Sequence, residues 1–195
     1  MIFPPRPRKL PDMTAQILPI LIHPDRRLRA KCEPVAEVDD SIRALLESML
    51  ATMYDAPGVG LAAPQLGVLK RVIVMDCVEK DAPPAPVKMV NPEILWSSEE
   101  LNVHEEGCLS VPEEYVDVTR PARVRARWLD ERGAPQEAEF DGLWATCVQH
   151  EIDHLDGKLF IDYVGPLKRK LITDRMKKLK RVRAREQEER EAGVA

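Results

Sequence analysis

The sequence predicts an α+β fold built as one domain. The expected strands follow one another in a block before the second main helix, instead of alternating with helices as in an α/β protein. The 195 residues are enough to bury one core, and 44% of them are hydrophobic, which excludes a largely disordered chain. Internal repeats and runs of eighteen apolar residues are both missing from the sequence, which excludes a solenoid and a membrane-spanning helix.

The first residues differ in composition from the rest. Residues 1–12 hold four prolines and three basic residues, and we expect them to form a disordered extension. These prolines also interrupt any secretory signal, and Met13 offers an alternative start. The four cysteines share no short spacing, so we interpret them as reduced thiols of a cytoplasmic protein.

In the first half of the chain we expect two short strands and one helix. Residues 17–22 form an apolar run that predicts a strand, after which His23 is expected to be exposed or to cap an element. Apolar residues then recur at spacings of three and four up to Tyr54, behind capping residues at 39–41, which predicts a helix that ends before Pro57. Residues 72–75 predict a buried strand.

The next segments predict a block of strands. Residues 87–96 and 116–128 read as strands, and a turn at 131–133 leads into a hairpin partner at 137–140. Within 116–128 an apolar face is expected to alternate with a solvated face made of Arg123, Arg125 and Arg127.

Two helices are expected near the end of the chain. The first spans residues 143–155, with Asp141 near its cap and Gly157 beyond its end. The second covers 167–185, whose Lys and Arg residues outnumber the single Asp174 and give it a charge of +9. Residues 1–167 carry −10, and residues 186–195 form an acidic tail.

The main indication of a metal-binding catalytic site is the motif Gln149-His150-Glu151-Ile152-Asp153-His154. Side chains at positions i and i+4 of a helix share one face, so His150 and His154 can bind one metal ion while Glu151 reaches a bound water. This arrangement is typical of hydrolytic metalloenzymes. The alternative is a chance match on a solvated helix, although apolar residues on this helix argue for burial.

Two histidines require a third protein ligand, which leaves an open position for water. The sequence offers Cys108, Cys147, His104 or an acidic residue. Cys147 lies one turn before His150 on the same face, whereas Cys108 follows Gly107 just past an expected strand. Spacing alone leaves these alternatives open, because a free cysteine is more often a small buried apolar residue.

Two further segments complete a resemblance to a known family. Residues 58–65 form a Gly- and Ala-rich turn that permits close backbone approach to a ligand, and residues 106–110 read Glu-Gly-Cys-Leu-Ser. Together with residues 149–154 they match, in order, the G-x-G-x-A-A-x-Q, E-G-C-L-S and Q-H-E-x-D-H motifs of peptide deformylases. The chain therefore resembles this bacterial family over residues 17–164, and Tyr115 departs from it by replacing a common basic residue.

The resemblance implies antiparallel β-sheets around a central metal-binding helix in a catalytic domain spanning 13–166. It implies Cys108, His150 and His154 as ligands of one divalent metal ion per chain, with Fe(II) expected and Zn, Ni or Co possible. The implied reaction removes the formyl group from the N-terminal formyl-methionine of newly synthesised proteins, in the cytoplasm of a bacterium. The ligand types alone would have favoured zinc.

The resemblance also implies residue roles. Glu151 would accept the proton of a metal-activated water, and Gln65 with the Leu109 backbone N–H would stabilise the oxyanion. Arg120 would pair with Glu106. The substrate contacts implied are Gly58, Val59, Gly60, His104, Glu106, Gly107, Leu143 and Cys147.

The expected partners are N-formyl-methionyl peptides and nascent chains, with neither DNA nor a membrane. The basic helix at 167–185 has two interpretations: a helix docked on the body by its apolar stripe, or a contact with ribosomal RNA phosphates. Other classes that remain open are a zinc endopeptidase and a basic-helix binding protein with a structural metal, which would need a fourth protein ligand.

Overall fold

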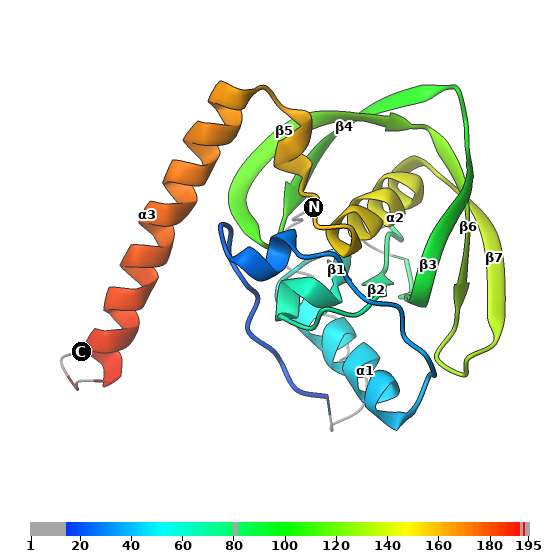
Figure 1. Cartoon of the computed structure of the whole chain (residues 1–195), viewed down its shortest axis with the longest axis horizontal. Helices are drawn as coiled ribbons and strands as arrows, with labels where there is room; N and C mark the ends of the chain where they lie inside the picture. Colours follow the sequence, from blue (N-terminus) through cyan, green and yellow to red (C-terminus); the bar gives the residue numbers. More distant parts are fainter. Residues whose placement is uncertain (1–14, 80–81, 192, 194–195) are drawn as a thin grey trace.

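A computed structural model describes residues 15–79, 82–191 and 193, and it shows one helix surrounded by antiparallel strands (Figure 1). Because the expected disordered extension 1–12 lies outside the described residues, that expectation stays a prediction. In chain order, the strands and the longer helices are α1 (Asp40–Asp55), β1 (Gly60–Ala62), β2 (Val72–Met75), β3 (Val87–Ser97), β4 (Leu101–Cys108), β5 (Val111–Pro121), β6 (Arg123–Leu129), β7 (Pro135–Asp141), α2 (Gly142–Leu155) and α3 (Pro166–Glu191).

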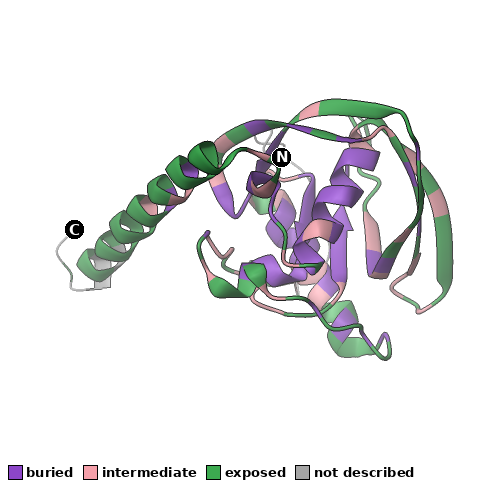
Figure 2. Cartoon of the chain, turned by 45° about the horizontal axis from the view of Figure 1, so that its top comes forward, coloured by how far each residue is buried: buried purple, intermediate pink, exposed green. Residues whose placement is uncertain are grey.

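The strands form two antiparallel sheets. The larger sheet has the order β1-β2-β3-β6-β7, and the smaller one pairs β4 with β5. Helix α2 lies between these sheets, and in Figure 2 its ribbon is almost entirely buried. The α+β class with antiparallel sheets is thereby confirmed. None of the helices in the described part is long and apolar enough to cross a bilayer.

Local sequence signals set the ends of the two inner helices. Asp39 caps α1, because its carboxylate accepts a hydrogen bond from the Ile42 backbone N–H at 2.9 Å. Asp141 occupies the N-cap position of α2, but its side chain makes no capping hydrogen bond. Gly157 follows the end of α2 with φ +73°, and a Cβ there would lie 2.5 Å from the Arg29 carbonyl oxygen, so only glycine fits.

Three of the sequence predictions are corrected. Residues 17–22 form no strand, although Leu21 donates a backbone hydrogen bond to Gln65. The single strand expected over 116–128 is in fact the end of β5 and most of β6, which belong to different sheets. The solvated arginine face within β6 is confirmed, since Arg123, Arg125 and Arg127 are exposed while Val124 and Ala126 are buried.

His23 is the third correction, because it is buried and not exposed. Its Nε2 lies 3.0 Å from the Thr173 hydroxyl of α3, so a helix far along the chain covers it. The apolar stripe of α3 is docked only in part. Ile172 and Met176 pack in the core with β5, whereas Leu167 and Leu171 stay exposed, and the helix then continues away from the body to Glu191 (Figure 1).

Replacing Ile172 by Ala is expected to lower the free energy of unfolding by about 2–5 kcal/mol, because the side chain is fully buried and would leave a cavity. The matched control is Leu171→Ala on the same helix, whose side chain is half exposed and which is expected to change stability by less than about 1 kcal/mol. Chemical denaturation of both variants gives the comparison. Equal effects would mean that α3 is not docked through Ile172.

Candidate metal centre

Helix α2 places His150 and His154 one turn apart on its buried face. Both imidazoles are less than 7% exposed, and their ring centroids are 5.0 Å apart. The helical spacing expected for two metal ligands is therefore present, and the histidines lie in the core and not on a solvated helix face. Gln149 anchors this part of α2, because its side-chain amide donates to the Pro121 carbonyl at the end of β5.

The end of β4 brings Cys108 to these histidines. The Cys108 Sγ lies 3.3 Å from His154 Nε2, and the donor atoms of Cys108, His150 and His154 all lie within 4.8 Å of one another. Ligand atoms of a tetrahedral site with bonds of 2.0–2.3 Å are about 3.5 Å apart, so one ion of that size fits between them. Two of the other candidates have different partners: Cys147 donates to the Val59 carbonyl, and His104 contacts Asn102. Among the described residues, the group of possible ligands at this place contains no carboxylate.

The electrostatics of the three side chains favour a cation. Burial disfavours the Cys108 thiolate, but the adjacent His154 and His150 hold the pKa of Cys108 well below its usual range. Burial likewise disfavours a charged His150, yet hydrogen bonds with Cys108 and Glu106 raise its pKa overall. A thiolate and two imidazoles that attract positive charge in this way fit a divalent metal ion with nitrogen and sulfur ligands.

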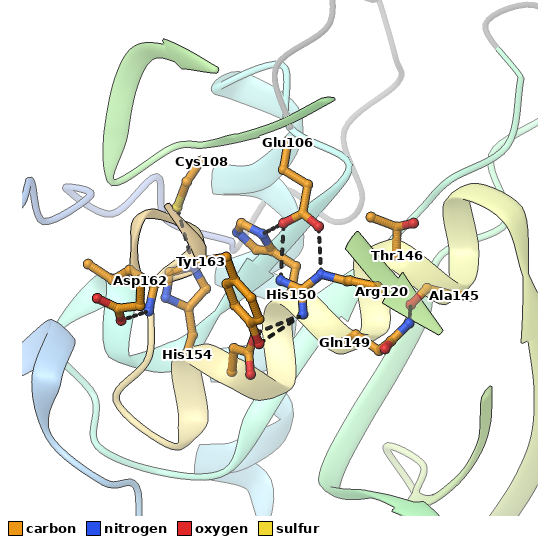
Figure 3. A network of polar contacts seen from close by, with 12 residues as sticks. Glu106, Cys108, Arg120, Ala145, Thr146, Gln149, His150, His154, Asp162 and Tyr163 are labelled. Carbon is orange, nitrogen blue, oxygen red and sulfur yellow. Dashed lines mark hydrogen bonds and ion pairs between the residues drawn. The ribbon is translucent and has the colours of Figure 1, made fainter. Parts of the chain in front are cut away.

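A buried ion-pair network holds His150 in place (Figure 3). Glu106 accepts a hydrogen bond from His150 Nδ1 at 2.8 Å and pairs with Arg120 Nε at 2.5 Å. Arg120 Nη1 also donates a hydrogen bond to Asp153 Oδ2 at 2.8 Å. The Tyr163 hydroxyl donates to the same oxygen. Burial raises the pKa of Glu106, but its bonds to His150 and Arg120 more than offset this and lower it to about 2. With Nδ1 engaged, Nε2 of His150 is left for a metal.

The Arg120–Glu106 pair that the resemblance implies is therefore present, and Asp153 pairs with the same arginine. Sequence reasoning did not find Tyr163, which lies over the Arg120 guanidinium with 4.8 Å between ring centroid and Cζ. No local pattern marks Tyr163, because its contact with the network depends on the short 3₁₀ helix Phe160–Tyr163 folding back on α2.

Glu151 and Gln65 complete the polar lining. Glu151 is 4% exposed, and its Oε2 has no hydrogen-bond partner among the described residues. Burial raises the pKa of this carboxyl. Gln65 is fixed by the Ala62 backbone N–H, which donates to its Oε1 at 2.8 Å, so its Nε2 points to Ser110 Oγ at 3.2 Å and Cys108 Sγ at 3.5 Å. The side-chain amide thus lies beside the proposed metal position.

A small pocket adjoins this centre. Its lining residues are Val59, Glu106, Gly107, Thr146, Cys147, His150 and Glu151. Four of the expected substrate contacts are therefore together, whereas His104 and Leu143 are half-buried outside this lining, and Gly58 and Gly60 do not line it either. Thr146 was missed, although its position three residues after Leu143 on the same helix would have indicated it.

Gly60 of β1 packs against the side chains of Cys147 and Glu151 on α2. A Cβ at this position would lie 2.3 Å from Glu151 Oε1 and 2.7 Å from Cys147 Sγ. Gly60→Ala is therefore expected to displace the Glu151 carboxylate. If Glu151 has the role that the resemblance implies, kcat falls by about 100-fold, the order of effect of a misplaced catalytic group. Gly165→Ala, where a Cβ would meet no atom within 4 Å, should leave kcat unchanged. An active Gly60→Ala enzyme would show that the Glu151 position is not critical.

A buried helix that carries two histidines and a glutamate, with a cysteine facing them, defines a metal-dependent hydrolase. The family model described as polypeptide deformylase matches residues 17–170. The chain belongs to the peptide deformylase family, whose members remove the formyl group from nascent peptides.

Several peptide deformylases are similar in sequence to this chain over most of their length. The peptide deformylase of Alkalilimnicola ehrlichii is 56% identical over 165 residues, covering 85% of this chain and 92% of the relative. That of Methylocella silvestris is 53% identical over 171 residues, covering 86% and 87%. The crystal structure from Legionella pneumophila is 48% identical with a TM-score of 0.81, covering 87% of this chain and 99% of that one. The Ehrlichia chaffeensis enzyme in complex with actinonin is 40% identical with a TM-score of 0.82, covering 85% and 98%.

Proposed function

We propose that Cys108, His150 and His154 hold one divalent metal ion and that Glu151 moves the protons in the hydrolysis of N-formyl-methionyl peptides. The observation that carries this assignment is the buried triad of donor atoms together with the nearby Glu151 oxygen, which has no hydrogen-bond partner in the described part of the chain. The resemblance to the family implies Fe(II) as the natural ion. Two imidazoles and a thiolate also suit zinc, nickel or cobalt.

When bound, such an ion supplies Lewis acidity that activates a water molecule and polarises the formyl oxygen. Glu151 accepts a proton from the water while the water oxygen adds to the formyl carbon. The carboxyl then donates that proton to the leaving nitrogen and the carbon–nitrogen bond breaks. A free amine and formic acid result, and the acid ionises to formate in solution. The raised pKa of Glu151 favours the first step, because a buried carboxylate accepts a proton more readily than an exposed one.

Negative charge develops on the formyl oxygen during this addition. We place two donors at it, the Gln65 side-chain amide and the Leu109 backbone N–H, since both adjoin Cys108 in the fold. The hydrogen bond from Ala62 to Gln65 Oε1 holds the amide with its N–H groups toward the centre. Such preorganised donors need no rearrangement when the charge appears.

We assign the methionine side chain of the substrate to the pocket beside Cys147 and Thr146, which has to widen on binding because its volume is about 10 Å³, close to that of one water molecule. Methionine has an unbranched and flexible side chain, so it suits a narrow pocket beside α2. A solved relative from Acinetobacter baumannii, 39% identical with a TM-score of 0.73, has Met-Ala-Ser bound, a peptide that begins with methionine. This supports N-formyl-methionyl peptides as the substrate class of the present chain.

The direct test is turnover of formyl-Met-Ala-Ser by protein loaded anaerobically with Fe(II) or Ni(II). We expect one formate and one free amine per peptide, and no turnover after the metal is removed by a chelator. A zinc endopeptidase would instead cleave internal bonds of longer peptides. Cleavage of internal bonds without formate release would overturn the proposal.

The substrate exists as nascent chains leave the ribosome, which places the proposed reaction in the bacterial cytoplasm. The distal half of α3 would contact ribosomal RNA, because Arg181, Arg183 and Arg185 are exposed there on an otherwise acidic protein. Replacing these three arginines by Gln is expected to weaken ribosome co-sedimentation at low salt by roughly tenfold or more and to flatten its salt dependence. Hydrolysis of a short formyl peptide should stay unchanged.

The control removes three exposed cations from the body, Arg26, Lys70 and Arg132, by the same replacement with Gln. It changes net charge equally but should leave co-sedimentation nearly intact. Equal losses in both triple variants would mean that overall charge, and not α3, drives the contact. Removal of the entire helix is a poorer test, because Ile172 and Met176 belong to the core.

A further inference from the structure

A second pocket lies between the first turns of α3 and the body of the protein. Its volume is about 570 Å³, within the range of small-molecule sites. Four cations line it, contributed by the body and by α3, and only two carboxylates accompany them: the cations are Arg29, Arg169, Lys170 and Lys177, and the carboxylates are Asp162 and Asp174. We call this cavity the α3 pocket.

Only two of these four cations form close ion pairs with the carboxylates. Arg29 pairs with Asp162, and Lys170 pairs with Asp174 at 2.7 Å. By contrast, Arg169 Nη1 is 3.6 Å from Asp162 and Lys177 Nζ is 3.8 Å from Asp174, both beyond hydrogen-bond length. The pocket therefore has two positive charges in excess, and the cations that provide them keep N–H groups able to turn toward a ligand.

His23 lies in the wall of this pocket and can report on its occupancy. It lines the α3 pocket, is 5% exposed, and its Nδ1 is buried without a hydrogen-bond partner among the described residues. The Thr173 hydroxyl donates to the Arg169 carbonyl, so it accepts from His23 Nε2, and Nδ1 is left as the unprotonated nitrogen. Burial and then the charge of Arg29 lower the pKa of His23 to about 4.

We propose that the α3 pocket binds a phosphate group, held by Arg169 and Lys177 with Arg29 at its base. A phosphate carries one to two negative charges, which matches the excess in the pocket, and arginine forms paired hydrogen bonds with its oxygens. The group belongs either to a small phosphorylated molecule or to the backbone of an RNA. The second source rests on the proposed ribosome contact, whereas the first does not.

The test titrates the zinc-loaded full chain with inorganic phosphate at constant ionic strength and follows the His23 ring signals by NMR. We expect a saturable shift that sodium chloride does not produce, and a rise in the pKa of His23 because the anion offsets the charge of Arg29. Arg169→Met with Lys177→Met should weaken phosphate binding by roughly tenfold or more. Both side chains are about half exposed, so the double variant should fold.

The matched control is Lys168→Met with Lys178→Met, two exposed lysines of α3 that do not line the pocket. It removes the same charge and should change the affinity by less than about twofold. Asp174→Asn should tighten binding, since it removes a carboxylate that competes for Lys177. Absence of a saturable shift, or equal weakening in both double variants, would overturn the proposal.

Repeating the comparison with a short single-stranded RNA distinguishes the two sources of phosphate. A larger loss of RNA affinity in the pocket variant than in its control assigns the site to an RNA backbone. Equal losses of RNA affinity, together with a selective loss of inorganic phosphate, assign it to a small phosphorylated molecule. Because the probe and the readout involve no formyl peptide, failure of this site is distinguishable from failure of the proposed deformylase chemistry.

Discussion

Replacing Glu151 by Gln is expected to lower kcat by about 10²–10⁴-fold while the metal stays bound. The amide has nearly the shape of the carboxylate but cannot accept a proton from water. Glu151 is buried with a partnerless oxygen beside the three donor atoms, so among the described residues it is placed to take that proton. Steady-state kinetics with a formyl-Met peptide and metal analysis of the same preparation give the measurement.

The matched control is Glu105→Gln, which removes an exposed carboxylate from β4 one residue before Glu106. It should leave kcat within about twofold of the unmodified enzyme, because surface substitutions away from the site have small effects. If metal-loaded Glu151→Gln turned over as fast as this control, another group would have to be the base.

Cys108→Ala is expected to abolish tight metal binding and, with it, nearly all activity. The change removes one of three donor atoms and the only negatively charged one, so two neutral imidazoles remain. In the cobalt-substituted protein, the thiolate-to-metal charge-transfer absorption should disappear with this variant. Metal stoichiometry after dialysis against a weak chelator provides a second measurement that does not depend on turnover.

Cys147→Ala provides the control, since Cys147 is equally buried and lies one turn before His150 but its thiol donates to the Val59 carbonyl. A hydrogen bond with the neighbouring Cys77, and then burial, raise the pKa of Cys147, which disfavours the thiolate that a metal requires. We expect this variant to keep its metal and to lose at most a little stability. A loss of metal from Cys147→Ala alone would contradict the assignment of Cys108.

Much of the centre could be predicted from the sequence because it depends on helix geometry. The spacing of His150 and His154 places both imidazoles on one face of any helix, whatever surrounds it. The N-cap at Asp39, the glycine after α2 and the alternation along β6 are also local, and each is present in the structure. The three motifs together also sufficed to indicate the family.

Other features were decided only by tertiary contacts. Spacing could not choose between Cys108 and Cys147, because the choice depends on how the end of β4 packs against α2. The alternation in residues 116–128 continues across Ala122, where the chain passes from one sheet to the other, so periodicity alone gave a single strand.

His23 shows the same limit of local reasoning. A histidine before a proline gives no sign of burial, and only the docking of α3 covers it and creates the α3 pocket beside it. A sequence pattern specifies which face of an element is apolar or polar, because that depends on residues three or four apart. Which faces then meet depends on contacts between residues far apart in the chain. The sequence by itself therefore determined the metal-binding helix and the family, whereas the tertiary structure decided which thiol faces the histidines and where the basic helix leaves the body.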